Sequence, residues 1–170
     1  KLTNVGATVE VLDFPVLLEA NVVRRARALS KAPAEEGVVL VAYGDSEYNL
    51  EWEALMLRMQ QAIERELEIT RTTYAWCGHI ASYKKEPTIK AIREVLAHKQ
   101  RALVVPVLVS VDEAFQYKII GGAVQDVDEP ERVAYVPDAI LPEPELTRWI
   151  IDVVKSTRAA LPQGDGRHER

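Results

Sequence analysis

The sequence predicts an α/β domain in which a four-stranded, mainly parallel sheet lies between two layers of helices, as in flavodoxin-like three-layer sandwiches. Two short apolar runs, VVLVA at 38–42 and ALVVPVLV at 102–109, are typical of strands buried on both faces. Segments with helical spacing of apolar residues alternate with the strand-like segments, and this alternation favours a parallel sheet. Because crossovers between parallel strands are right-handed, few topologies remain, and we expect the strand order 2-1-3-4.

The first half of the chain is expected to contain two helices and two strands. A helix over 14–29 begins after Asp13, which is a good N-cap residue. The segment ITRTTYAWC at 69–77 is rich in β-branched and aromatic residues, so it is expected to be the second strand. Between the first two strands lies a helix over 47–68, whose apolar stripe consists of Leu50, Leu55, Met59, Ile63 and Leu67.

The second half continues the alternation of helices and strands. Glu86-Pro87 opens a helix, and the strand at 102–109 follows it. Asp112 caps a short helix that we expect to end at Gly121-Gly122, before a fourth strand over 133–136. A last helix follows 142–144, with these apolar residues expected to face the core: Leu146, Trp149, Ile150, Val153 and Val154.

Composition and length bound the class of protein. The chain has 170 residues, of which 48 % are apolar and 28 % are charged, as is usual for a globular protein. The net charge of -5, without a block of Lys or Arg, argues against a nucleic-acid partner. No apolar run is long enough to span a membrane, no signal peptide is visible, and Cys77 is the only cysteine, so we expect a cytoplasmic protein without a membrane partner. We divide the chain into an N-terminal helix and loop (1–36), the α/β domain (37–160) and a disordered tail (161–170).

Polar residues follow the carboxyl ends of the predicted strands, which is where open α/β sheets bind their ligands. The groups gathered there include an imidazole and several carboxylates, and such a set suits a transition metal or a polar macrocycle. The candidate site residues at this edge are Tyr43, Gly44, Asp45, Ser46, Asn49, His79, Ser110, Asp112 and Glu113.

Several of these residues also have purely structural interpretations. Tyr43 fits an aromatic side chain that packs on the next helix, and Asp45, Ser46 and Asp112 fit helix caps. Glu113 fits the first turn of a helix, where carboxylates are favoured by the helix dipole.

Three segments carry a family resemblance. VVLVAYGDSEYNLEWEAL at 38–55, ALVVPVLVSVDEAF at 102–115 and ILPEPELTRWIIDVV at 140–154 resemble the first strand and loop, the third strand and the last helix of the sirohydrochlorin cobaltochelatases. These are small type II chelatases of cobalamin and sirohaem synthesis, and the resemblance spans roughly residues 36–158. It implies a chelatase-like fold, a tetrapyrrole ligand and a divalent metal substrate such as cobalt, iron or nickel, with no organic cofactor. It also implies a homodimer or a second chelatase-like half.

The sequence departs from that family at its histidines. In the family, a histidine at the end of the first strand holds the metal and helps to remove pyrrole protons, and here Tyr43 stands in its place. The second family histidine falls near Ala114 or Phe115, neither of which ligates a metal. A metal chelatase of this kind would therefore use a different set, with Tyr43, His79 and Glu113 as catalytic residues and His79 and Glu113 holding the metal.

Metal insertion expels two pyrrole N–H protons, so a chelatase needs a base, and histidine is suited to this role. Without the two family histidines, two alternatives stay open. The protein binds a tetrapyrrole without inserting a metal, or it is a non-catalytic ligand- or partner-binding module on the same scaffold.

Overall fold

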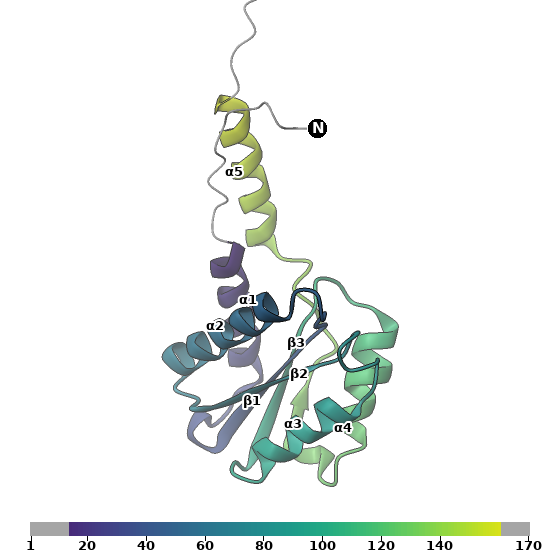
Figure 1. Ribbon diagram of the computed structural model, residues 1–170. Helices are drawn as coiled ribbons and strands as arrows, with labels where there is room; N and C mark the ends of the chain where they lie inside the picture. Colours follow the sequence, from purple (N-terminus) through teal and green to yellow (C-terminus); the bar gives the residue numbers. More distant parts are fainter. Residues whose placement is uncertain (1–13, 161–170) are drawn as a thin grey trace, which may run out of the picture.

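The four strands form one sheet with the order β2-β1-β3-β4, and all three strand pairs are parallel. The computed structural model, which describes residues 14–160, is shown in Figure 1. The predicted fold class and strand order are thus confirmed. The strands are β1 (Glu36–Ala42), β2 (Arg71–Trp76), β3 (Arg101–Val107) and β4 (Val133–Tyr135).

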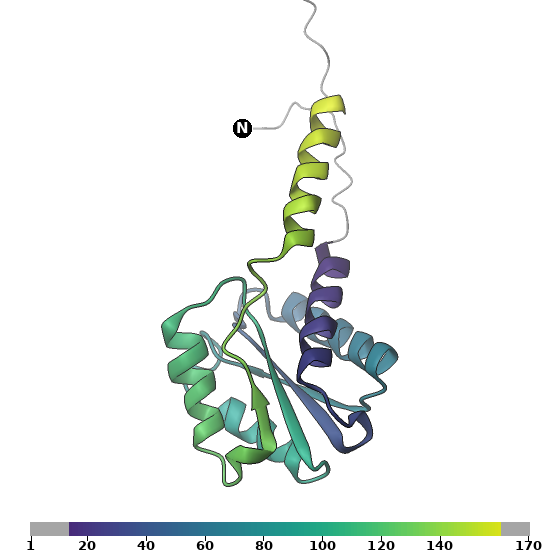
Figure 2. The same cartoon turned by 180° about the vertical axis from the view of Figure 1, so that it is seen from behind.

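Helices cover both faces of the sheet. On one face, α1 and α2 pack on β1, β2 and β3, and on the other face lie α3, the π-helix η2 and α4 (Figures 1 and 2). The helices are α1 (Phe14–Leu29), α2 (Asn49–Leu67), α3 (Glu86–Leu96), η2 (Glu113–Gly121), α4 (Gly122–Gln125) and α5 (Pro144–Ala160), with short 3-10 turns at η1 (Pro33–Glu35) and η3 (Pro130–Arg132).

The central strand β1 shows why the sequence forms this three-layer structure. Successive side chains of a strand point to opposite faces. Val38 and Leu40 belong to the core beneath α1 and α2, whereas Val39 and Val41 belong to the core beneath α3 and η2. All of these side chains are fully buried, so the continuous apolar run reflects a strand covered on both sides.

Helix α1 is part of the same core as the sheet. Its residues Leu18, Val22, Val23 and Ala26 are buried together with residues of β1, β3 and α2. The segment 14–36 therefore folds against the α/β domain, although it precedes the first strand. The predicted tail at 161–170 lies outside the described residues.

Two details of the predicted helices are wrong. The helix that Asp112 caps does not end at Gly121-Gly122 but continues as α4 to Gln125, because both glycines adopt right-handed helical angles. Leu50 is 78 % exposed and not part of the inner stripe of α2, because the first turn of this helix does not reach the core.

Helix α5 projects away from the sheet, beyond the carboxyl ends of the strands (Figures 1 and 2). Ile150 and Val154, which were expected to face the core, are 49 % and 60 % exposed. Their pattern is that of an amphipathic helix, but the segment before α5 leads the chain away from the sheet. Among residues 14–160, no helix is both long and apolar enough to cross a membrane.

Candidate functional site

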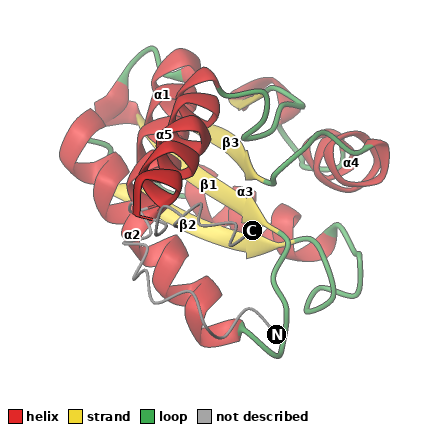
Figure 3. Cartoon of the chain, turned by 90° about the horizontal axis from the view of Figure 1, so that it is seen from above, coloured by secondary structure: helices red, strands yellow, loops and turns green. Residues whose placement is uncertain are grey.

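Four rings meet at the carboxyl edge of the sheet, and we call Tyr43, His79, Tyr83 and Phe115 the aromatic cluster. The ring of Tyr43 is central, with centroid distances of 5.3 Å to His79, 5.6 Å to Phe115 and 6.4 Å to Tyr83. The rings meet mainly edge to face, which is a favourable arrangement for aromatic pairs. The cluster joins the chain that follows β1, the loop that follows β2 and the start of η2. Figure 3 looks down on this end of the molecule, with α5 pointing toward the viewer.

Two glycines make room for the cluster. The backbone N–H of Gly78 donates a hydrogen bond to the carbonyl of Tyr43 at 2.7 Å. A Cβ atom on Gly78 would lie 2.6 Å from both the ring and the carbonyl oxygen of Tyr43, so a larger residue does not fit. Gly44 has a φ of +69°, in the left-handed region that favours glycine, and its backbone lies directly on the ring of Trp76.

Two hydrogen bonds fix the polar atoms of the cluster. The Nδ1 atom of His79 lies 3.1 Å from Oδ2 of Asp45, and this bond holds the pKa of the Asp45 carboxyl below its usual value. The hydroxyls of Tyr43 and Tyr83 lie 3.1 Å apart. This second bond raises the pKa of Tyr43 to about 12, so the Tyr43 phenol is protonated at neutral pH.

The loop that carries Tyr83 has an unusual backbone. Ser82 and Tyr83 both have positive φ angles, of 50° and 58°, which are uncommon for residues other than glycine. Backbone strain of this kind tends to occur at functional sites, where the surrounding structure enforces it. Here it accompanies the placement of the Tyr83 ring beside both Tyr43 and His79.

The other candidate residues make local contacts. Glu113 is 79 % exposed and forms an ion pair with Lys118 at 3.2 Å. Asp112 caps η2 by accepting the backbone N–H groups of Ala114 and Phe115, as one of its two interpretations predicted. Asn49 donates to Glu53 at 2.9 Å.

Ser46 and Ser110 are exposed, and the carbonyl of Ser110 accepts a hydrogen bond from Gln116. The structure therefore brings together Tyr43, Asp45 and His79, with Gly44 shaping the turn between them.

The possible metal ligands among the described residues are His, Cys, Asp and Glu side chains. No group of three His, Cys, Asp or Glu side chains among residues 14–160 is arranged to hold a metal ion. Cys77 lies two residues from His79, but it is buried, and burial raises the pKa of its thiol to about 12, so the thiol is protonated at neutral pH.

Sequence reasoning missed Tyr83 and Phe115 as members of the site. Tyr83 lies in the middle of a loop, and Phe115 follows a helix cap, so no strand end marks either residue. Two signals were available: both aromatic residues lie in segments that follow strands of a parallel sheet, and the family resemblance placed the second family histidine near Phe115.

Exposed apolar side chains accompany the cluster in the loops after β1, β2 and β3 and in the first turn of α2. Isolated exposed apolar residues are normal on a protein surface, but several at one edge indicate a binding surface. They are Tyr48, Leu50, Ile80, Tyr83, Val109 and Val111.

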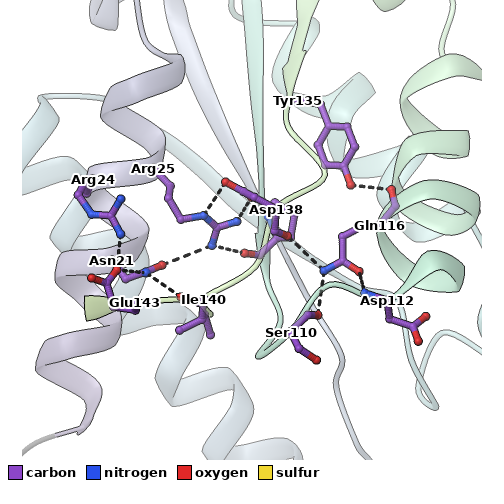
Figure 4. Close-up of polar contacts among 11 residues, drawn as sticks. Asn21, Arg24, Arg25, Ser110, Asp112, Gln116, Tyr135, Asp138, Ile140 and Glu143 are labelled. Carbon is purple, nitrogen blue, oxygen red and sulfur yellow. Dashed lines mark hydrogen bonds and ion pairs between the residues drawn. The ribbon is translucent and has the colours of Figure 1, made fainter. Parts of the chain in front are cut away.

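A second polar group lies at the same end of the molecule but is buried (Figure 4). Arg25 forms a two-point ion pair with Asp138 and donates to the carbonyl of Pro106. Asn21 donates to Glu143 at 2.7 Å, and Glu143 also pairs with Arg24. These contacts join α1 to the segment between β4 and α5, so their role is structural.

A scan of the sequence against protein-family models and a search of the curated proteins found no match.

Proposed function

We propose that the protein binds a tetrapyrrole at the carboxyl edge of its sheet, with the aromatic cluster as the contact surface for the ring. The observation that carries this proposal is the cluster itself, in which the ring of Tyr43 contacts the rings of His79, Tyr83 and Phe115 beyond the ends of neighbouring strands. A flat conjugated ring is the class of ligand that such a surface favours, because it buries a wide apolar area and stacks on aromatic faces. The resemblance of three segments to sirohydrochlorin cobaltochelatases points to the same ligand class.

We further propose that His79 acts on the bound ring during insertion of a divalent metal. It is the one histidine near the cluster among the described residues, and its side chain is more than half exposed. Histidine is the natural acceptor for pyrrole protons near neutral pH. Histidines that ligate metals also nearly always donate their other ring N–H to a carboxylate or carbonyl, and Asp45 provides such a carboxylate.

Absorbance titration with sirohydrochlorin tests the binding proposal. We expect saturable binding that weakens about fivefold or more in Phe115→Ala, because an aromatic contact contributes about 1 kcal/mol beyond its buried area. Tyr117→Ala is the matched control, because Tyr117 lies on the same helix but is exposed and outside the cluster. Equal loss in both variants, or no binding by the parent protein, would contradict the proposal.

Addition of cobalt(II) to the bound complex tests catalysis. In the enzyme, the spectrum of the metallated ring should appear over many turnovers, and His79→Ala should slow it by roughly a hundredfold or more. A spectrum that changes only in proportion to the protein would mean binding without insertion.

A second candidate function is a non-catalytic module that pairs with a second copy of the chain. The exposed residues Ile150, Ile151 and Val154 on the projecting helix α5 favour it, because apolar helix faces of this kind commonly pack against a partner. Sedimentation velocity tests the pairing. A dimer that dissociates in the variant Ile150→Lys/Val154→Lys supports this function, and a concentration-independent monomer excludes it.

A further inference from the structure

The imidazole of His79 is fixed by three neighbours. The carboxylate of Asp45 lies 3.1 Å from Nδ1, the ring of Tyr43 lies 5.3 Å away, and the ring of Tyr83 lies 5.4 Å away. Both tyrosine rings meet the imidazole at steep angles, of 68° and 85°. A loop histidine with one contact would be free to rotate, whereas this ring has one orientation that satisfies all three neighbours.

The hydrogen bond to Asp45 determines which nitrogen carries the proton. An ionised carboxylate only accepts hydrogen bonds, and aspartate carboxyls are ordinarily ionised at neutral pH. Nδ1 of His79 must therefore be the donor. In the neutral imidazole the lone pair then lies on Nε2, and within residues 14–160 no protein group bonds to that atom.

We propose that Asp45 is a positioning residue, which holds neutral His79 as the Nδ1–H tautomer and leaves the lone pair of Nε2 open to a ligand. This assignment concerns the protein alone, and only its use in catalysis rests on the proposed function. There, Nε2 would form a bond to a pyrrole proton as the N–H bond breaks, and the electron pair would stay on the pyrrole nitrogen for the incoming divalent metal. The positive imidazolium that results would be stabilised by the negative charge of Asp45.

Asp45 also has a local structural role, which the test must separate from the proposed one. Its Oδ1 accepts the backbone N–H of Glu47 at 2.9 Å, and this contact stabilises the turn after β1. A mutation that only disturbed this turn would change the stability of the fold but would not specify the tautomer of a histidine in another loop.

Nitrogen NMR of protein labelled with ¹⁵N-histidine reads the tautomer directly. The measurement is made near pH 8.5, above the range in which imidazoles ordinarily titrate. We expect the protonated nitrogen of His79 to be Nδ1 in the parent protein. Asp45→Ala should shift His79 to the Nε2–H form or to a mixture. Asp45→Asn should also weaken the preference for Nδ1–H, because its amide can either accept from Nδ1 or donate to it. The resonances of His79 are assigned with the variant His79→Gln.

His98 is the internal control for this experiment. It is exposed near the end of α3 and distant in sequence from the loop of Asp45, so its signals should be identical in all three proteins. An unchanged circular dichroism spectrum of Asp45→Ala shows that the domain is still folded.

The proposal fails if His79 is the Nε2–H tautomer in the parent protein, or if Asp45→Ala leaves Nδ1–H unchanged. Neither result depends on a ligand. A protein that shows the expected tautomers but does not bind sirohydrochlorin would refute the proposed function and leave the assignment of Asp45 intact.

Discussion

Arg25 of α1 reaches the carboxyl end of the sheet, where its Nε donates to Asp138 at 3.0 Å and its Nη1 donates to the carbonyl of Pro106 at 2.7 Å. The arginine is only 7 % exposed. One side chain thus fixes a helix that precedes the first strand to the end of β3 and to the segment after β4 (Figure 4).

Replacing Arg25 with methionine should strongly destabilise the protein. The change leaves the carbonyl of Pro106 and the carboxylate of Asp138 without their donor, and because Asp138 is 38 % exposed the expected cost is that of unpaired acceptors, about 1–3 kcal/mol, rather than that of a fully buried ion pair. Urea unfolding followed by circular dichroism measures this loss. Arg27→Met is the matched control, because Arg27 is exposed on the same helix, and a similar small loss in both variants would contradict the structural role of Arg25.

Glu36 should make the stability of the protein depend on pH in the acid range. Burial alone raises the pKa of this carboxyl, but hydrogen bonds from Ser30, Lys31 and Arg101 outweigh burial and leave the pKa below its usual value. Because the folded-state pKa is lowered, the stabilisation is present above the unfolded pKa of about 4.3 and is lost as the pH falls through the lowered value.

The variant Glu36→Gln tests this origin of the acid sensitivity. At pH 7 it should be less stable by about 2 kcal/mol, because hydrogen bonds to a charged group are lost. Its stability should also fall less steeply below pH ~4 than that of the parent. Glu35→Gln is the control, because Glu35 is exposed and adjacent. Urea unfolding at several pH values gives the free energy of unfolding of each protein as a function of pH. If this dependence is the same for the parent and Glu36→Gln, Glu36 is not the origin of the acid sensitivity.

Gly78→Ala should displace Tyr43 and disrupt the aromatic cluster. The new methyl group would lie 2.6 Å from the Tyr43 ring, which is too close for any real contact. We expect the ring-current shifts of Tyr43, His79 and Phe115 to change in the proton NMR spectrum and sirohydrochlorin binding to weaken. Unchanged shifts would show that these rings do not pack as described.

Tyr83→Phe should lower the pKa of Tyr43 from about 12 toward the ordinary value for tyrosine, because the hydrogen bond between the two hydroxyls is the main cause of the raised pKa. The raised pKa favours the neutral phenol in the folded state. Its contribution to stability is therefore present below pH ~10 and is lost as the pH rises through the folded-state value. The absorbance of tyrosinate near 295 nm follows this titration, with Tyr43→Phe identifying the signal. An unchanged titration in Tyr83→Phe would exclude the hydrogen bond.

Truncating a valine to alanine should destabilise the protein in α1 but not in α5. Val22→Ala removes fully buried groups beneath α1 and should cost about 2 kcal/mol. Val154→Ala removes an exposed side chain of the projecting helix and should change the stability of the monomer by less than about 0.5 kcal/mol. Urea unfolding at low protein concentration measures both, and an equal cost would mean that α5 packs against the body of the domain.

Local sequence patterns specified the sheet, its order and the edge where the polar residues gather. A continuous apolar run such as residues 38–42 of β1 predicts a strand buried on both faces, because such a strand has little room for polar side chains. The rules of parallel crossovers then leave few strand orders, of which 2-1-3-4 was the expected one, and the residue that follows each strand must lie at the carboxyl edge. Tyr43, Asp45 and His79 could be placed at one edge for this reason.

Which residues meet at that edge was decided only by the tertiary structure. Tyr83 and Phe115 join Tyr43 through the paths of two loops, and Glu113, equally close to a strand end, pairs with Lys118 instead. Helix α5 has the apolar pattern of a core helix, yet it projects from the sheet because the segment before it leads away. An apolar pattern shows that one face of a helix favours burial. It does not show which segment buries that face, because this depends on contacts between residues far apart in the sequence.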